Sequence, residues 1–187
     1  MTCEREKLVH RIWKRDSYLI STDAALVPVS ELNVAFSSDL VYWAEPLPDH
    51  IMRETLDTSL CFGLYEAGAN THTDSDLSAA SLKFIGFARC ITDFTTFLFL
   101  TDVFINPSYQ GKGLGAWLVG CIHETIESMP YLRRSMLFTS DWKRSVPFYE
   151  KILDMSVVEC KRGVNGEYGE GAAIMQKLGP AFPTSLR

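Results

Sequence analysis

The spacing of apolar residues along the chain predicts a set of strands. Residues 7–13 and 18–21 alternate apolar and polar side chains, as a half-buried strand or hairpin does. Two longer and more continuous apolar runs, residues 82–91 and 95–105, predict neighbouring strands near the centre of a sheet, joined by a tight turn. Shorter apolar runs predict further strands at residues 59–65, 135–139, 157–160 and 172–177.

Helical spacing predicts helices between these strands. The most regular is residues 114–129, where apolar side chains recur on one face and Pro130 stops the helix. Asp141 is suited to cap a helix over residues 143–153, with Pro147 near its start. Two other helices are predicted, a short one within residues 23–36 and one over residues 48–58.

The order of these elements indicates one domain spanning residues 1–187, because no repeat or linker divides the chain. It runs strand, two helices, three antiparallel strands, helix, strand, helix and two strands. Residues 67–80 are poor in apolar side chains and predict a loop between two strands. With 187 residues, the chain is long enough to bury a sizeable core.

Composition narrows the class of protein. Apolar residues make up 47% and charged residues 22%, and the net charge of −5 comes with no Lys/Arg-rich run, so a nucleic-acid partner is not expected. No apolar run reaches the ~18 residues of a membrane helix. The five cysteines form no C-x-x-C pair and the histidines are scattered, so no metal is expected. Without a signal peptide, these cysteines favour a reducing, cytoplasmic location.

A glycine-rich loop, Gln110 to Ala116, lies between the second long strand and the most regular helix. Three alternate glycines let a ligand approach the backbone, and the first N–H groups of a helix have no partner within it. Such a place binds anions, phosphates above all, and Lys112 adds a positive charge. The loop therefore predicts a pyrophosphate cradle.

Three known glycine-loop patterns are candidates. The P-loop spacing is absent. Gly111-x-Gly113-x-x-Ala116 fits the dinucleotide fingerprint, but the acidic residue expected about 20 positions later is missing. The segment Gln110-Gly-Lys-Gly-Leu-Gly115 resembles the Q/R-x-x-G-x-G/A signature of the GNAT superfamily of acyl-CoA N-acyltransferases. It follows a strand, Asp102-Val-Phe-Ile-Asn-Pro, of the type that precedes the loop in that family.

A second block supports the resemblance. Leu137 to Lys151 followed by Leu153-Asp-Met resembles the family's L-x-T-x-D-A…L/F-Y-x-K-x-G-F segment, with Trp142 where Ala is usual and Asp154-Met155 in place of Gly-Phe. The resemblance covers nearly the whole chain. It implies an α+β fold, the αβα sandwich of the GNAT family. In that fold a mixed, mostly antiparallel sheet is splayed between its fourth and fifth strands and flanked by helices.

The resemblance also implies a cosubstrate, acetyl-CoA, and residues that hold it. The backbone of the splayed strand would bind the pantetheine arm and polarise the thioester carbonyl, while the side chains there are expected in the core. Tyr149 corresponds to a tyrosine general acid for the departing thiolate, although by residue type alone a packing role is favoured. The expected cofactor-binding residues are Val103, Phe104, Ile105, Gln110, Gly111, Lys112, Gly113, Leu114, Gly115, Ala116, Asp141 and Ser145.

The acceptor is expected to be the primary amine of a small molecule, acetylated directly in a ternary complex. A carboxylate must take the amine's proton, and Glu45, Asp93 and Asp102 are all candidates. A peptide or protein acetyltransferase and a non-catalytic acyl-CoA-binding domain are alternatives, and a homodimer is left open. The acceptor site is predicted from Tyr42, Trp43, Ser59, Phe62, Asp102 and the loop after Cys160.

Overall fold

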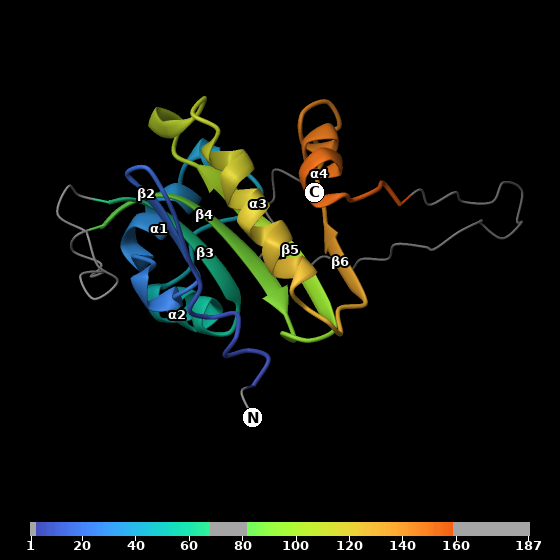
Figure 1. The fold of residues 1–187 in the computed structure, drawn as a ribbon. Helices are drawn as coiled ribbons and strands as arrows, with labels where there is room; N and C mark the ends of the chain where they lie inside the picture. Colours follow the sequence, from blue (N-terminus) through green and yellow to red (C-terminus); the bar gives the residue numbers. More distant parts are fainter. Residues whose placement is uncertain (1–2, 68–81, 159–187) are drawn as a thin grey trace, which may run out of the picture. The chain divides into compact units, whose positions relative to one another are not determined.

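The computed structural model describes residues 3–67 and 82–158 (Figure 1). The chain forms two compact units, residues 1–138 and residues 139–187. The first unit carries the sheet and three α-helices, and the second begins just before a fourth helix, α4 (Ser145–Leu153). A single domain over residues 1–187 stays a prediction.

One six-stranded sheet forms the centre of the first unit, with its strands in chain order. β1 to β5 pair as sequential antiparallel neighbours, and β6 alone joins in parallel, beside β5 (Figure 1). The two long apolar runs therefore form a hairpin, as predicted. The strands are β1 (Ile12–Arg15), β2 (Tyr18–Ser21), β3 (Leu60–Ala67), β4 (Leu82–Thr92), β5 (Phe97–Ile105) and β6 (Arg134–Leu137).

The sheet opens between β5 and β6. Their parallel ladder covers four residue pairs and ends at Leu100 and Leu137. Beyond that point the rest of β5 has no strand partner on this side among the described residues. The predicted element order contains a single strand before the two helices, where the structure has the hairpin of β1 and β2. In that numbering β5 and β6 are the fourth and fifth strands, and the opening between them confirms the predicted splay.

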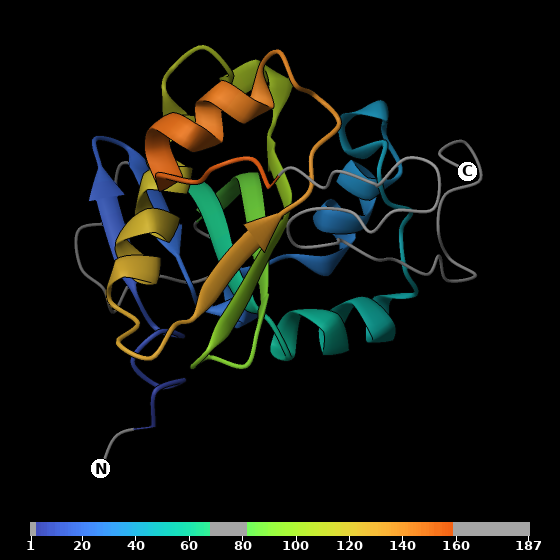
Figure 2. The same ribbon diagram turned by 90° about the vertical axis from the view of Figure 1, so that its right-hand side faces the viewer.

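Helices cover both faces of this sheet. α1 (Val29–Phe36) and α2 (Asp49–Asp57) pack on one face, and α3 (Leu114–Glu127) packs on the other (Figure 2). Leu32 and Leu56 are fully buried on the α1 and α2 side, and Leu118 is fully buried on α3. Short 3₁₀ turns connect these elements at Ala24–Leu26, Asp39–Val41 and Pro107–Tyr109.

Two predicted strands differ from the structure, and a third lies outside the described residues. Residues 7–10 form a turn, because the N–H groups of Leu8 and Val9 both donate to the Arg5 carbonyl, and of these four residues only Leu8 is buried. Val157 and Val158 are exposed and belong to no strand. Residues 159–160, the predicted strand at residues 172–177 and nearly all of the predicted loop at residues 67–80 lie outside the described residues.

Candidate active site

The glycine loop follows β5 after the short 3₁₀ turn Pro107–Tyr109 and leads into the N-terminus of α3. Gly111 and Gly113 have φ angles of 78° and 72°, in the left-handed region where glycine is strongly favoured. A Cβ added to either would meet nothing within 4 Å, so the space beside their backbone is open. The first helical hydrogen bond runs from Trp117 N to Gly113 O, which leaves the N–H groups of Leu114, Gly115 and Ala116 without helical acceptors.

Side chains on the loop tie it to the sheet. The Gln110 amide donates to the Ile105 carbonyl at the end of β5, at 2.9 Å. The ammonium of Lys112 lies 4.8 Å from the centroid of the Tyr109 ring and 3.5 Å from the Tyr18 hydroxyl. Gln110 therefore fixes the loop geometry, and Lys112 places its charge on the tyrosine side of the loop.

A β-bulge interrupts β5 just before the loop. Thr101 pairs with Arg89 and Phe104 with Phe87, so Asp102 and Val103 together face one residue of β4. Asp102 has a φ angle of 54°, the conformation that glycine usually supplies in such bulges. The side chain of Ile105 is buried, as expected, and that of Phe104 is buried as well. The side chain of Val103, also expected in the core, is only half-buried.

Asp102 lies at the centre of a polar cluster under the α1 and α2 side of the sheet. Its side chain is buried and forms an ion pair with Arg89, with Nε and Oδ2 2.7 Å apart. Oδ1 accepts hydrogen bonds from the Trp43 indole at 3.4 Å and the Thr101 hydroxyl at 3.1 Å. Arg89 also donates to the Ser59 hydroxyl at 3.3 Å. The structure thus brings together three of the predicted acceptor residues, Trp43, Ser59 and Asp102.

Arg89 is the residue that the sequence analysis missed. A signal was present, because the two apolar strands of the predicted hairpin contain few charged residues: Lys83 and Arg89 on β4 and Asp102 on β5. Opposite charges on two facing apolar strands favour a cross-strand ion pair.

Two further predicted acceptor residues are Tyr42, which lies beside Trp43, and Phe62, which lies beside Trp13. Tyr42 is half-exposed and packs edge-on against Trp43, with ring centroids 5.1 Å apart. Phe62 is completely buried and stacks on Trp13, whose indole bonds to Glu124 of α3. Because successive side chains of a strand alternate faces, Phe62 points to the α3 side, away from Asp102. Phe62 therefore does not join the Asp102 cluster, and its role in the acceptor site stays a prediction.

Asp93, one candidate base, shapes the turn between β4 and β5. Its carboxylate accepts from the backbone N–H groups of Thr95, Thr96 and Phe97 and from the Thr96 hydroxyl. These bonds, the one from the Thr96 hydroxyl first, hold the pKa of Asp93 far below its usual value. A carboxylate so stabilised in its charged form is a poor proton acceptor. Glu45, the second candidate, is exposed in the loop before α2.

Asp93→Ala is expected to lower the melting temperature, because the carboxylate holds the turn. Since folding lowers this pKa, the stabilisation is present above pH ~3.9 and is lost as the pH falls through the folded pKa. The melting difference between wild type and variant should therefore shrink below pH 4. Asp93→Asn keeps one acceptor oxygen and should melt in between. Identical melting of Asp93→Ala and wild type at pH 7 would contradict this role.

The second unit carries the remaining predicted residues. Asp141 caps the turn before α4: Oδ1 accepts from Arg144 N at 3.0 Å, and Oδ2 pairs with Arg144 Nε at 2.7 Å. These bonds, with the one from the Arg144 backbone first, lower the pKa of Asp141. The helix begins at Ser145, two residues later than predicted, and Trp142 in the turn is exposed. Cofactor binding by Asp141 and Ser145 stays a prediction.

Tyr149 lies in the middle of α4, half-buried and edge-on to Phe148 at 5.1 Å. Burial raises the pKa of its phenol to about 12. The hydroxyl therefore stays protonated throughout the neutral range and can donate. α4 ends at Leu153 and is capped by Asp154, whose φ of 52° is left-handed. The aspartate thus adopts the conformation that the family's glycine would have at this position.

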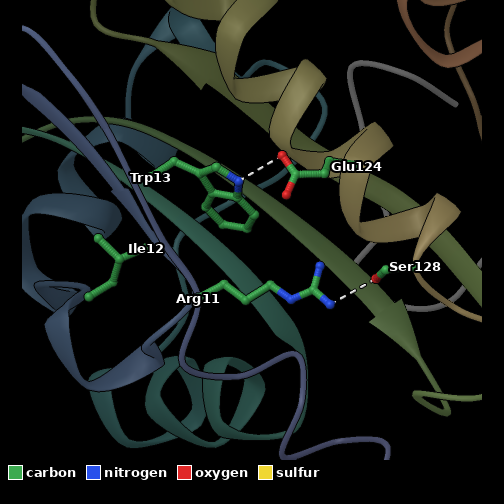
Figure 3. A pocket seen from close by; sticks show the side chains of 5 residues that line it. All are labelled: Arg11, Ile12, Trp13, Glu124 and Ser128. Carbon is green, nitrogen blue, oxygen red and sulfur yellow. Dashed lines mark hydrogen bonds between the residues drawn. The ribbon is translucent and has the colours of Figure 1, made fainter.

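A separate shallow hollow of about 430 Å³ lies between β1 and α3 (Figure 3). Its walls are held by two hydrogen bonds, from Arg11 to Ser128 at 2.8 Å and from Trp13 to Glu124 at 2.9 Å. None of the predicted site residues lines it. The hollow therefore belongs to neither the glycine loop nor the Asp102 cluster.

Two further observations concern only the described part of the chain. It contains no group of three His, Cys, Asp or Glu residues that could hold a metal ion. None of its helices has both the length and the apolar character needed to cross a membrane.

Comparison with known proteins assigns the family. The model of the Acetyltransferase (GNAT) family matches residues 38–155, a range that includes the glycine loop, the Asp102 bulge and α4. The chain belongs to this family and is an acetyltransferase by class. A protein of Gibberella zeae, named a putative acetyltransferase, is 41% identical over 133 residues, which are 69% of this chain and 75% of the relative.

Solved structures agree with the fold. A crystal structure from Xanthomonas campestris pv. campestris, described as a putative acetyltransferase of the GNAT family, superposes with a TM-score of 0.57 at 26% identity and covers 83% of this chain and 99% of its own. A GNAT-family acetyltransferase from Streptococcus pneumoniae has a TM-score of 0.52 at 21% identity and covers 82% and 94%.

Proposed function

We propose that this protein transfers an acetyl group from acetyl-CoA to the primary amine of a small molecule, directly in a ternary complex. The observation that carries the proposal is the glycine loop. Two left-handed glycines with open space beside them lead into a helix whose first N–H groups lack helical acceptors. This arrangement fits a pyrophosphate held by backbone N–H groups.

The open edge of β5 supports the second part of the proposal. Beyond Leu100, β5 has no strand partner on the β6 side among the described residues, so its backbone groups are available to an extended ligand. Val103 to Ile105 would pair with the pantetheine arm in the manner of an added strand. A backbone N–H there would polarise the thioester carbonyl. The Ile105 carbonyl already accepts from Gln110, so it contributes less.

The proton balance is simple in this reaction. A neutral amine loses one proton as the amide forms and the leaving thiolate takes up one, so the two cancel. An amine that starts as the ammonium ion releases one further proton to solvent. Tyr149, whose pKa of about 12 lies well above the ~8.5 of an ordinary thiol, keeps its proton and stabilises the leaving thiolate by donating a hydrogen bond. Tyr42 and Trp43 are proposed to border the acceptor, and the residue that takes the amine proton is not assigned.

Acetyl-CoA consumption over a panel of amines tests the function. The panel should include polyamines, amino acids, aminoglycosides, arylamines and peptides with free N-termini, with release of free thiol as the readout. Turnover with small amines supports the proposal. Turnover confined to peptides would indicate a peptide acetyltransferase. Cofactor binding without turnover on any amine would indicate a non-catalytic binding domain.

Coenzyme A is expected to bind and NAD is not, because the loop lacks the acidic partner that a ribose needs. Isothermal calorimetry with each ligand measures this directly. ADP is a useful control, since it carries a pyrophosphate but no pantetheine arm, and it should bind more weakly than coenzyme A. Tight NAD binding without coenzyme A binding would contradict the proposed cosubstrate.

A further inference from the structure

The left-handed conformation of Asp102 demands an explanation. A non-glycine residue at a φ of 54° is strained, and bulges of this kind usually place glycine there. Aspartate tolerates the conformation better than most residues, but it needs local partners to do so. Here the bulge immediately precedes Val103 to Ile105, the backbone that the proposed function assigns to the thioester.

The partners of Asp102 come from three separate segments. Arg89 reaches across the bulge from β4, Trp43 comes from the loop between α1 and α2, and Thr101 is the preceding residue. Both carboxylate oxygens are occupied, and the residue is buried. An ion pair of this kind, buried and supported by further hydrogen bonds, is costly to break because a single remaining charge would be left unpaired.

We propose that Arg89 and Asp102 are positioning residues for acetyl transfer. Their ion pair holds the bulge in its left-handed conformation and so aims the backbone of residues 103–105 at the thioester. Through the indole of Trp43, the same carboxylate fixes the loop that borders the acceptor. The inference rests on the proposed function for the identity of the positioned groups, which are the backbone of residues 103–105 and the acceptor loop. It rests on the geometry of the bulge for the way in which these groups are held.

This role differs from that of a general base. A base must have a carboxylate oxygen within reach of the incoming amine. In Asp102 one oxygen pairs with Arg89 and the other accepts two hydrogen bonds. The arrangement is suited to holding the backbone, and Arg89 compensates the charge that would otherwise attract an amine.

Two double variants separate the roles. Arg89→Met/Asp102→Gly and Arg89→Met/Asp102→Ala both remove the ion pair without leaving a buried unpaired charge. They differ only in that glycine adopts a positive φ freely and alanine does not. The glycine form should retain a kcat about tenfold higher than the alanine form, the factor expected for the cost of a left-handed residue. The Kd for coenzyme A should be equal, because the glycine loop is untouched.

The φ angle of residue 102 is measured independently of activity by NMR, from the backbone chemical shifts and couplings of that residue. A positive φ is expected in wild type and the glycine form but not in the alanine form. Arg89→Met alone should lower kcat with little change in coenzyme A affinity, a division that a loss of stability alone would not produce.

Two results would overturn the proposal. Equal and near-complete loss of kcat in both double variants, with a positive φ in the glycine form, would mean that the carboxylate acts directly. Equal kcat in both, with φ positive in both, would mean that the bulge needs no ion pair. If wild type consumed no acetyl-CoA with any amine, the proposed function would fail, whereas the signs of φ would still decide whether the ion pair holds the bulge.

Discussion

Gly113→Asp is expected to weaken coenzyme A binding by at least about 100-fold while the protein stays folded. Gly113 is the N-terminal cap of α3 and is followed by the N–H groups of the proposed pyrophosphate cradle. A carboxylate placed there would stand beside the phosphates. Two unit charges 4 Å apart near a protein surface repel by about 4 kcal/mol, more than the ~2.7 kcal/mol that corresponds to 100-fold in Kd.

The fold should tolerate this substitution for identifiable reasons. A Cβ at position 113 meets no atom within 4 Å, and aspartate is among the residues that accept a left-handed conformation. Its negative charge also favours a helix N-terminus. Calorimetry with coenzyme A and thermal unfolding of the same samples give both quantities.

Gly113→Asn is the matched control, since asparagine has nearly the same size and tolerance of positive φ but no charge. It should weaken binding by about 10-fold, through steric obstruction alone. Lys112→Ala should cost only a few-fold, because an exposed charge is partly screened. Wild-type affinity in a folded Gly113→Asp protein would place the pyrophosphate elsewhere.

Tyr149→Phe is expected to lower kcat by roughly 10²-fold, the usual scale for losing one hydrogen-bond donor to charge that develops in the transition state. The change removes one hydroxyl and almost no volume, so the half-buried packing on α4 should persist. Coenzyme A affinity and the acceptor KM should stay near wild type, because the hydroxyl interacts with charge that develops only in the transition state. Single-turnover acetyl transfer with a confirmed acceptor measures the chemical step.

The pH profile adds a second test of Tyr149. Burial raises its pKa to about 12, so the phenol keeps its proton as the pH rises from 6 to 10. No loss of kcat in that range should therefore trace to Tyr149, and the shape of the profile should be the same in the Phe variant. Tyr131→Phe, at an exposed position, is the control for hydroxyl removal. Near-normal single-turnover rates in Tyr149→Phe would remove it from the mechanism.

Long, regular patterns gave the correct fold from sequence. The hairpin of β4 and β5 and the helix α3 each contain enough apolar positions to define one structure, and the glycine loop is placed by both. Short patterns were less reliable. Residues 7–10 alternate like a strand, yet two hydrogen bonds to a single carbonyl turn the chain there.

Features set by distant contacts could not be read from sequence. Every residue of β3 from Leu60 to Tyr65 is buried, so the sequence does not show which face Phe62 occupies. The register with β4 decides it. Asp102 was predicted at the acceptor site, but its left-handed backbone depends on Arg89 and on Trp43, 13 and 59 positions away. Sequence reasoning found the unusual residue and missed its partner.

Two of the left-handed aspartates, Asp102 and Asp154, differ in how freely they could be replaced during evolution. At position 154 the side chain is exposed, so exchange between aspartate and glycine leaves the backbone in place and alters only surface charge. A sequence motif that requires glycine at this position would therefore fail to match chains that carry aspartate there. Position 102 is different, because replacing Asp102 alone leaves Arg89 without a counter-charge. We therefore expect residues 89 and 102 to be substituted only together.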